Sequence, residues 1–193
     1  MQQFLEERQS YKNLFPTVTT AAWNDIQAKG VFQEFASGEY FLRAGEPAVN
    51  TFWLFSGVCR EFFMTLAGKE FNKAFSVPGQ VTGSLYDLNL GAPSTVTIEF
   101  IQPSRGLLLP FKEVKNLCVK HESFNRLYYE LLEALFMKKS RREYELLTLS
   151  ATERFLRFKE LYPDLDRQIP LYHIASYLGI TPEALSRIRK NSP

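Results

Sequence analysis

Short apolar runs separated by glycine and proline dominate the first part of the chain. Three of these runs, residues 35–42, 51–57 and 58–64, have the length and the aromatic content of β-strands and are bounded by turn residues. Residues 66–69, Leu-Ala-Gly-Lys, have the form of a hairpin turn. A helical stretch over residues 13–28 precedes the strands. The pattern predicts an α+β fold that begins with an antiparallel β-roll and a helical preface.

A long run with helical periodicity follows, from Ser123 to Leu149, and contains neither glycine nor proline. As one helix it would be about 40 Å long. Two arrangements are open, one with the helix wholly on its own β domain and one in which its broad apolar face also packs on a second copy of the chain. We favour the second, because so long a helix is unusual in one small domain. The apolar positions are Phe124, Leu127, Tyr128, Leu131, Leu135 and Leu146.

The end of the chain has the pattern of a separate helical domain. Ser150 and Glu153 have capping-box spacing and predict that a new helix begins directly after the long one. The chain is therefore expected to consist of a β-roll, sensor-like domain over residues 1–122, a long dimerisation helix over 123–149 and a DNA-binding domain over 150–193.

Two short helices joined by a glycine turn are predicted between Pro170 and Lys190. Gly179 suits the left-handed position that ends a helix. Thr181 can cap the next helix, and Pro182 suits its first position. Helices joined in this way form a helix-turn-helix, whose second helix enters the major groove of DNA. The alternative is a plain helical hairpin whose last turn is basic because cations suit helix C-termini.

The outward-facing residues of the second helix have the chemistry of DNA recognition. Arg187 can contact a guanine edge with two hydrogen bonds, Glu183 can accept from a cytosine amine, and Ser186 can contact a base or a phosphate. Lys190 and Arg189 suit phosphate contacts. The candidate DNA-binding residues are Thr181, Glu183, Ser186, Arg187, Arg189 and Lys190.

The segment from Ile174 to Arg189 resembles the helix-turn-helix of the CRP/FNR family of transcription regulators. The order of β-roll, long helix and helix-turn-helix is also similar to that family. The resemblance implies a cytoplasmic homodimer joined by the long helices, bound to a palindromic DNA operator with half-sites about one helical turn apart. RNA polymerase and a small-molecule effector of unknown identity are further partners that it implies. The features of the first half that resemble the family's cyclic-nucleotide-binding-type domain are Gly38-Glu39, Gly45-Glu46, Phe52–Phe55 before Gly57, Gly79 and Gly83.

The phosphate-binding cassette of that family is degenerate in this chain. Members that bind cyclic AMP carry a Gly-Glu pair and, further on, an arginine followed by a hydroxyl residue. Gly83 matches the glycine, but Ser84 stands in the place of the glutamate. Ser94 stands in the place of the arginine, and Thr95 retains the hydroxyl. Loss of the arginine removes a charge-assisted hydrogen bond worth about 1.5–3 kcal/mol, so these four ligand-binding candidates are expected not to bind cyclic AMP.

Several other residues allow more than one interpretation. If the chain is aligned differently with the cassette, Arg60 or Arg105 could supply the missing arginine to a ligand, although neither lies in the motif. His173 is expected to be solvated or to contact a DNA phosphate. The basic run over residues 138–142 is interpreted as a solvated face of the long helix, with a phosphate-contacting role as the alternative. Five aromatic residues could line an effector pocket or belong to the core: Phe41, Phe62, Phe63, Tyr86 and Phe100.

Composition narrows the possible classes of protein. The formal net charge is only +2, so positive charge for DNA binding must be local. Cys59, Cys118, His121 and His173 are too dispersed for a metal cluster close in sequence, so we expect no metal and no cofactor. Residues 1–10 are polar and acidic and unlike a signal peptide, and no apolar run is long enough to span a membrane.

A dimeric DNA-binding transcription regulator with a degenerate sensing domain is the favoured function. The alternative is a ligand-binding or protein-interaction module of the same fold without DNA-binding activity. The modest net charge favours this alternative, as does the end of the chain at Pro193, where many CRP/FNR regulators continue into a β-hairpin wing. An enzyme is the least favoured class, because the common hydrolase, metalloprotease and phosphate-loop motifs are absent and no residue is assigned a catalytic role.

Overall fold

The computed structural model describes residues 11–191 of the chain. The segments at either end, on which the expectations about a signal peptide and a missing wing depend, lie outside the described residues. Two compact units are present, one formed by residues up to Glu61 together with Phe75–Glu133, the other by Phe62–Ala74 together with the chain from Ala134 onward. Within residues 11–191, no helix is both long enough and apolar enough to cross a membrane.

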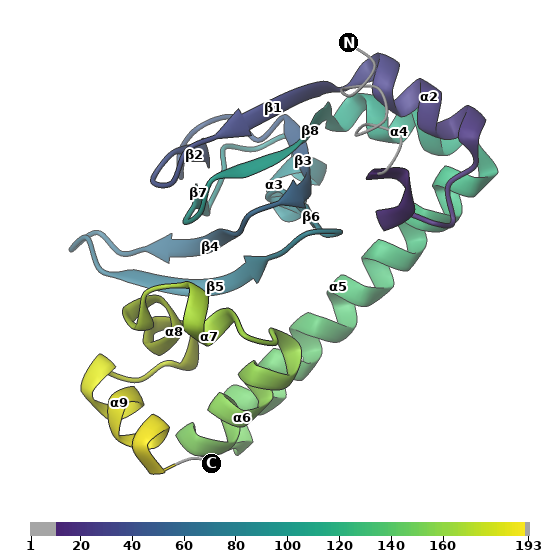
Figure 1. The fold of residues 1–193 in the computed structure, drawn as a ribbon. Helices are drawn as coiled ribbons and strands as arrows, with labels where there is room; N and C mark the ends of the chain where they lie inside the picture. The colour runs from purple at the N-terminus through teal and green to yellow at the C-terminus, as the bar shows by residue number, and fades with distance from the viewer. Residues whose placement is uncertain (1–10, 192–193) are drawn as a thin grey trace. The chain divides into compact units, whose positions relative to one another are not determined.

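Two four-stranded sheets are formed by the strands of the described residues (Figure 1). The strand order is β1-β8-β3-β6 in one sheet and β2-β7-β4-β5 in the other. The pairs β1–β8, β3–β8, β3–β6 and β2–β7 are antiparallel, as the sequence predicts for a β-roll. The strands are β1 (Val31–Phe35), β2 (Tyr40–Leu42), β3 (Asn50–Ser56), β4 (Cys59–Met64), β5 (Glu70–Ser76), β6 (Val81–Thr82), β7 (Thr97–Phe100) and β8 (Ser104–Pro110).

Helices precede and follow the strands. The long helix predicted over residues 123–149 is confirmed as α5, which has 27 residues. It does not form a unit of its own, because its residues are divided between the two units at positions 133 and 134. The helical preface consists of a 3-10 turn and a separate helix. The helices are η1 (Tyr11–Leu14), α2 (Thr20–Lys29), α3 (Leu85–Leu90), α4 (Phe111–Lys120), α5 (Glu122–Thr148), α6 (Ala151–Leu161), α7 (Leu165–Gln168), α8 (Leu171–Leu178) and α9 (Pro182–Asn191).

Aromatic rings pack on one another in the core of the first unit. The ring of Phe52 lies edge-on to that of Phe100, with ring centroids 5.2 Å apart. The ring of Trp53 stacks on that of Phe124 from α5, with centroids 5.8 Å apart. Phe124 and Leu127 are almost completely buried in this core. The first turns of α5 therefore belong to the packing of the β-roll.

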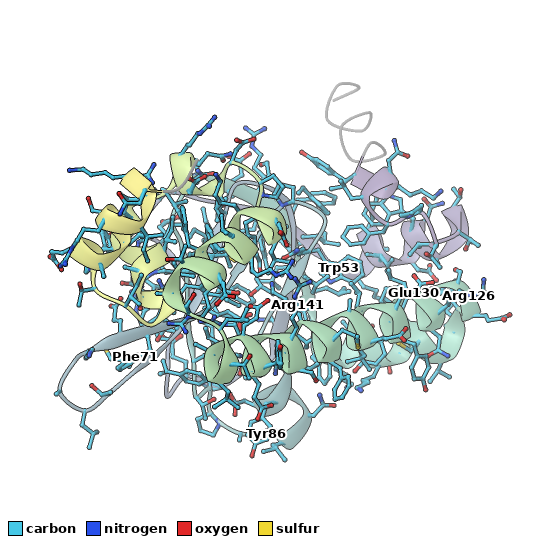
Figure 2. All side chains as sticks on the ribbon, turned by 90° about the horizontal axis from the view of Figure 1, so that it is seen from below. Trp53, Phe71, Tyr86, Arg126, Glu130 and Arg141 are labelled. Atoms are coloured by element: carbon cyan, nitrogen blue, oxygen red, sulfur yellow. The ribbon has the colours of Figure 1, made fainter. Side chains whose placement is uncertain are left out.

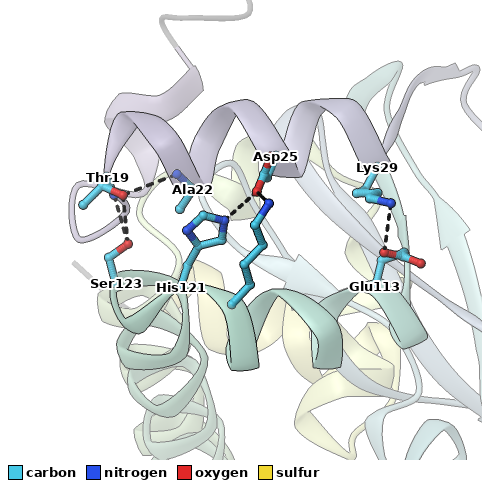
Figure 3. Close-up of polar contacts among 8 residues, drawn as sticks. Thr19, Ala22, Asp25, Lys29, Glu113, His121 and Ser123 are labelled. Atoms are coloured by element: carbon cyan, nitrogen blue, oxygen red, sulfur yellow. Dashed lines mark hydrogen bonds and ion pairs between the residues drawn. The ribbon is translucent and has the colours of Figure 1, made fainter.

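Polar contacts fasten α2 to the junction of α4 and α5 (Figure 3). The Asp25 carboxylate accepts a hydrogen bond from Lys120 Nζ at 2.5 Å and lies 2.6 Å from His121 Nε2. The hydroxyl groups of Thr19 and Ser123 are 3.2 Å apart. The hydrogen bond from Lys120, and next the one with His121, hold the pKa of Asp25 below its ordinary value. These contacts fix the N-terminal end of α5 on the first unit.

Candidate nucleic-acid interface

Helices α8 and α9 form the predicted helix-turn-helix. Gly179 follows α8 with φ 70° and ψ 34°, the left-handed conformation that favours glycine. The N–H of Ile180 donates to the carbonyl of Ala175 at 3.0 Å and closes the last turn of α8. The hydroxyl of Thr181 accepts the N–H of Ala184 at 3.2 Å, so Thr181 caps α9 as expected. The turn is built from the residues that the sequence indicated.

An apolar core lies beneath these two helices. Ile174, Leu178 and Leu185 have no measurable exposure. Phe155 and Phe158 of α6 are also buried and belong to the same unit. Burial of each such side chain contributes about 1.5–3 kcal/mol to folding. The helix pair is therefore held by its own hydrophobic packing, which leaves the opposite face of α9 to solvent.

The solvent face of α9 is predominantly basic. Arg187, Arg189 and Lys190 are exposed and stand against one acidic residue of the helix, Glu183. A backbone hydrogen bond at Glu183 itself, and next the hydroxyl of Thr181, hold the pKa of the Glu183 carboxyl below its ordinary value. Glu183 is therefore ionised at neutral pH and can accept hydrogen bonds. All six predicted DNA-binding residues are exposed: Thr181, Glu183, Ser186, Arg187, Arg189 and Lys190.

Two basic residues of α5 contact tyrosines of the second unit. Lys138 Nζ lies 5.1 Å from the centre of the Tyr162 ring, and the guanidinium carbon of Arg142 lies 3.8 Å from the centre of the Tyr177 ring. Burial raises the pKa of the Tyr177 hydroxyl to about 12. The interpretation of residues 138–142 as a solvated face is therefore wrong for these two side chains. They are four residues apart, one helical turn, and so face the same side of α5.

His173 is buried, so the expectation of a solvated or phosphate-contacting histidine is wrong. It is 4% exposed. Asn72, from the hairpin segment that belongs to the second unit, donates through Nδ2 to the carbonyl of His173 at 2.8 Å. The N–H of Asn72 donates to the hydroxyl of Ser176 at 2.9 Å. The face of α8 that carries His173 and Ser176 therefore lies against β5.

The cassette-like segment forms hydrogen bonds with itself. The carboxylate of Asp87 is 1% exposed, and its Oδ2 atom accepts from the hydroxyl of Ser84 at 2.5 Å. The same atom accepts from the N–H and the hydroxyl of Thr95 at 2.8 and 2.9 Å. The hydroxyl of Ser94 donates to a backbone carbonyl at 2.8 Å, and Gly83 has φ 152°. The polar atoms that the sequence offered to a ligand are thus bonded to the protein.

The two arginines considered as alternative ligand-binding groups form ion pairs within the protein. Arg60 Nε donates to Glu99 at 2.7 Å, and both residues lie in the second sheet. Arg105 forms an exposed ion pair with Glu34 at 2.9 Å. The aromatic candidates for a pocket are divided between core and surface: Phe62 and Phe100 are buried, Phe41 is half-buried, and Phe63 and Tyr86 are exposed. The side chain of Tyr86, on α3, is labelled in Figure 2.

An exposed apolar stripe runs along α5. Tyr129, Phe136 and Leu147 are 63%, 68% and 78% exposed. Phe136 and Leu147 follow Tyr129 by about two and five helical turns, so the three side chains share one face. Met137 and Tyr144 flank this stripe and are also exposed. We call these five residues the α5 stripe.

Sequence reasoning missed three residues that shape these sites. Asp87 follows Ser84 by three residues, a spacing typical of a helix N-terminus, and this was the available signal. Arg142 and Arg154 carry no local signal, because their roles depend on contacts with α8, which is far away in the sequence.

The β-roll, long helix and helix-turn-helix define the fold of CRP/FNR-type transcription regulators. CLP of Xanthomonas campestris, a c-di-GMP responsive global regulator, matches with a TM-score of 0.71 and 15% identity over 90% of this chain and 91% of its own. FixK2 of Bradyrhizobium japonicum matches with a TM-score of 0.70 and 20% identity over 84% and 83%. The catabolite activator protein of Thermus thermophilus matches with a TM-score of 0.57 and 19% identity over 92% and 85%.

These identities, all of 20% or less, show a shared fold. By sequence, no protein-family model matches the chain, nor does any curated protein.

Proposed function

We propose that this protein is a sequence-specific, DNA-binding transcription regulator that acts as a homodimer in the cytoplasm. The observation that carries the proposal is the exposed, basic face of α9 on a helix-turn-helix with a complete turn and its own apolar core. Arg187 and Glu183 are the base-reading residues, and Ser186 supports them. Arg189 and Lys190 contact phosphates, position the helix and make binding sensitive to salt.

The α5 stripe is the proposed dimer interface. Its exposed aromatic and aliphatic side chains lie on one helical face, as the packing of two parallel copies about a two-fold axis requires. Such a dimer would present two copies of α9 to two half-sites about one turn of DNA apart. RNA polymerase is the partner that such a regulator would recruit or block.

Cyclic AMP is not the effector in this proposal. The donors of Ser84 and Thr95 are bonded to the buried carboxylate of Asp87, which would also repel a phosphate. Isothermal calorimetry with cyclic AMP should detect no binding. A dissociation constant below about 10 µM, an affinity of about −7 kcal/mol, would contradict this part of the proposal.

Selection from a pool of random duplexes tests the DNA-binding function. The purified protein is incubated with the pool in moderate salt without added ligand, and the bound duplexes are sequenced. Enrichment of a two-fold symmetric motif is expected. A protein that enriches no motif, yet is dimeric and folded, would contradict the proposal and favour an interaction module that does not read DNA.

A further inference from the structure

The last two carbonyl groups of α8 have no hydrogen-bond donor from the backbone of the helix itself. The last four carbonyl groups of any α-helix lack partners within the helix. In α8, the carbonyl of Ala175 accepts the N–H of Ile180 at 3.0 Å. The carbonyl of Ser176 accepts the N–H of Gly179 at 3.2 Å. The carbonyls of the last two residues need donors from elsewhere.

Two arginines from other helices supply these donors. Arg142 of α5 donates through Nη2 to the carbonyl of Tyr177 and lies over the ring of the same residue. Arg154 of α6 donates through Nε to the carbonyl of Leu178 at 3.0 Å. Its Nη1 donates to the carbonyl of Leu149, between α5 and α6, at 2.6 Å. One guanidinium thus joins the end of α5 to the end of α8.

Electrostatics favours both cations at this place, although burial opposes one of them. The C-terminus of a helix carries partial negative charge, which attracts a guanidinium. Burial lowers the pKa of Arg142 from its ordinary value. Its Nη1 is buried and has no hydrogen-bond partner among residues 11–191. Because an apolar side chain could pack on Tyr177 without this penalty, stability alone does not explain an arginine there.

We propose that Arg142 and Arg154 are positioning residues of the DNA-binding site, which hold the C-terminal end of α8, and with it α9, in a fixed direction relative to α5. Only residues 179–181 separate α8 from α9, so the direction of one helix sets that of the other. Since α5 carries the proposed dimer stripe, the two arginines align both recognition helices with the dimer axis. This inference rests on the proposed function.

Arginine is specifically required by this geometry. The planar guanidinium of Arg154 presents two N–H groups in different directions, to Leu178 and to Leu149. A lysine at either position retains the charge and most of the aliphatic stem, but it has one compact ammonium group and cannot reproduce the fork. Lysine variants therefore test positioning without a change in net charge.

The test compares Arg142→Lys and Arg154→Lys with Arg157→Lys. Arg157 lies on the same helix as Arg154 but pairs with the exposed Glu160 at 2.7 Å, so it is a matched control. We expect each of the first two variants to bind the selected duplex about tenfold more weakly, or worse, with an unchanged dependence on salt. The control should bind like the wild type. Lys190→Ala, a phosphate-contact variant, should instead reduce the salt slope by about one.

Three results would overturn the proposal. Wild-type affinity in both lysine variants would show that the fork is not needed. A shallower salt slope would make these arginines phosphate contacts. The apolar core of the helix pair is intact in the lysine variants, so both should still unfold cooperatively. Loss of a cooperative thermal transition would show that the two arginines are needed for folding and not for orientation.

A measurement without DNA separates failure of this inference from failure of the proposed function. Nitroxide labels are placed at Glu143→Cys on α5 and Ser186→Cys on α9, both exposed, in a Cys118→Ser background diluted with unlabelled protein. Cys59 is buried and its pKa is raised to about 12, so it does not react with the label. Pulsed electron resonance should show a broader distance distribution in Arg154→Lys than in Arg157→Lys. Equal widths would overturn the positioning role even in a protein that binds no DNA.

Discussion

Phe136→Ala should weaken the dimer strongly. Phe136 lies in the middle of the α5 stripe and is 68% exposed, so packing against a second copy would bury about two thirds of its side chain. Complete burial of a phenylalanine contributes about 1.5–3 kcal/mol, which gives about 1–2 kcal/mol for this fraction. A two-fold interface contains the residue twice, so the dimer should lose about 2–4 kcal/mol. The dissociation constant should rise by a factor of about 30 to 1000.

Sedimentation equilibrium over a series of protein concentrations measures this constant. Tyr86→Ala is a matched control, because Tyr86 is an aromatic residue with 67% exposure that belongs to α3 and not to the stripe. The control should dimerise like the wild type. If Phe136→Ala also has the wild-type constant, or if the wild type is monomeric at all concentrations, the assignment of the α5 stripe as the interface is wrong.

Three further substitutions test the local structure. Gly179→Ala should lower stability by about 1 kcal/mol and the unfolding midpoint by about 2–4 °C, because alanine is strained at φ 70° although there is space for its Cβ. A thermal melt that matches the wild type would refute the left-handed turn. Asp87→Ala should destabilise the protein by about 1–3 kcal/mol in urea, because the buried hydroxyl of Ser84 loses its acceptor; an unchanged midpoint would show that the carboxylate is dispensable. Asp25→Asn should reduce stability at neutral pH but not in strong acid. The pKa of Asp25 is lowered in the folded state, so the stabilisation that its carboxylate provides is complete above the ordinary pKa of 3.8 and disappears as the pH falls through the lower pKa of the folded state. A difference in stability between variant and wild type that stays constant down to acid pH would contradict this contact.

Local sequence rules predicted the elements whose form depends on neighbouring residues. The left-handed Gly179, the cap at Thr181 and the hairpin turn at residues 66–69 each depend on a few adjacent positions. The capping box of Ser150 and Glu153 is present as predicted, with both reciprocal hydrogen bonds. These elements could be predicted because the conformational preference of one or two residues decides them.

Contacts between distant residues could not be predicted in the same way. His173 is buried and in contact with Asn72, which lies 101 positions earlier and donates to its carbonyl. Arg142 belongs to a helix whose sequence suggests a solvated basic face, yet Tyr177 covers it from 35 positions away. The Asp87 carboxylate accepts hydrogen bonds from the hydroxyls of Ser84 and Thr95, because residues 84 and 95 lie close together in the fold. A pattern of single positions contains no information about such pairs.

Duplex selection with Arg187→Ala, beside the wild type and Lys190→Ala, tests most directly whether α9 reads DNA sequence. The wild type should enrich a two-fold symmetric motif, and Arg187→Ala should relax the preference at one base pair of each half-site with a loss of about 1–3 kcal/mol. Lys190→Ala should weaken binding to all duplexes alike and retain the motif. Equal losses for both variants on every sequence would contradict base reading by Arg187 and leave α9 as a purely electrostatic contact.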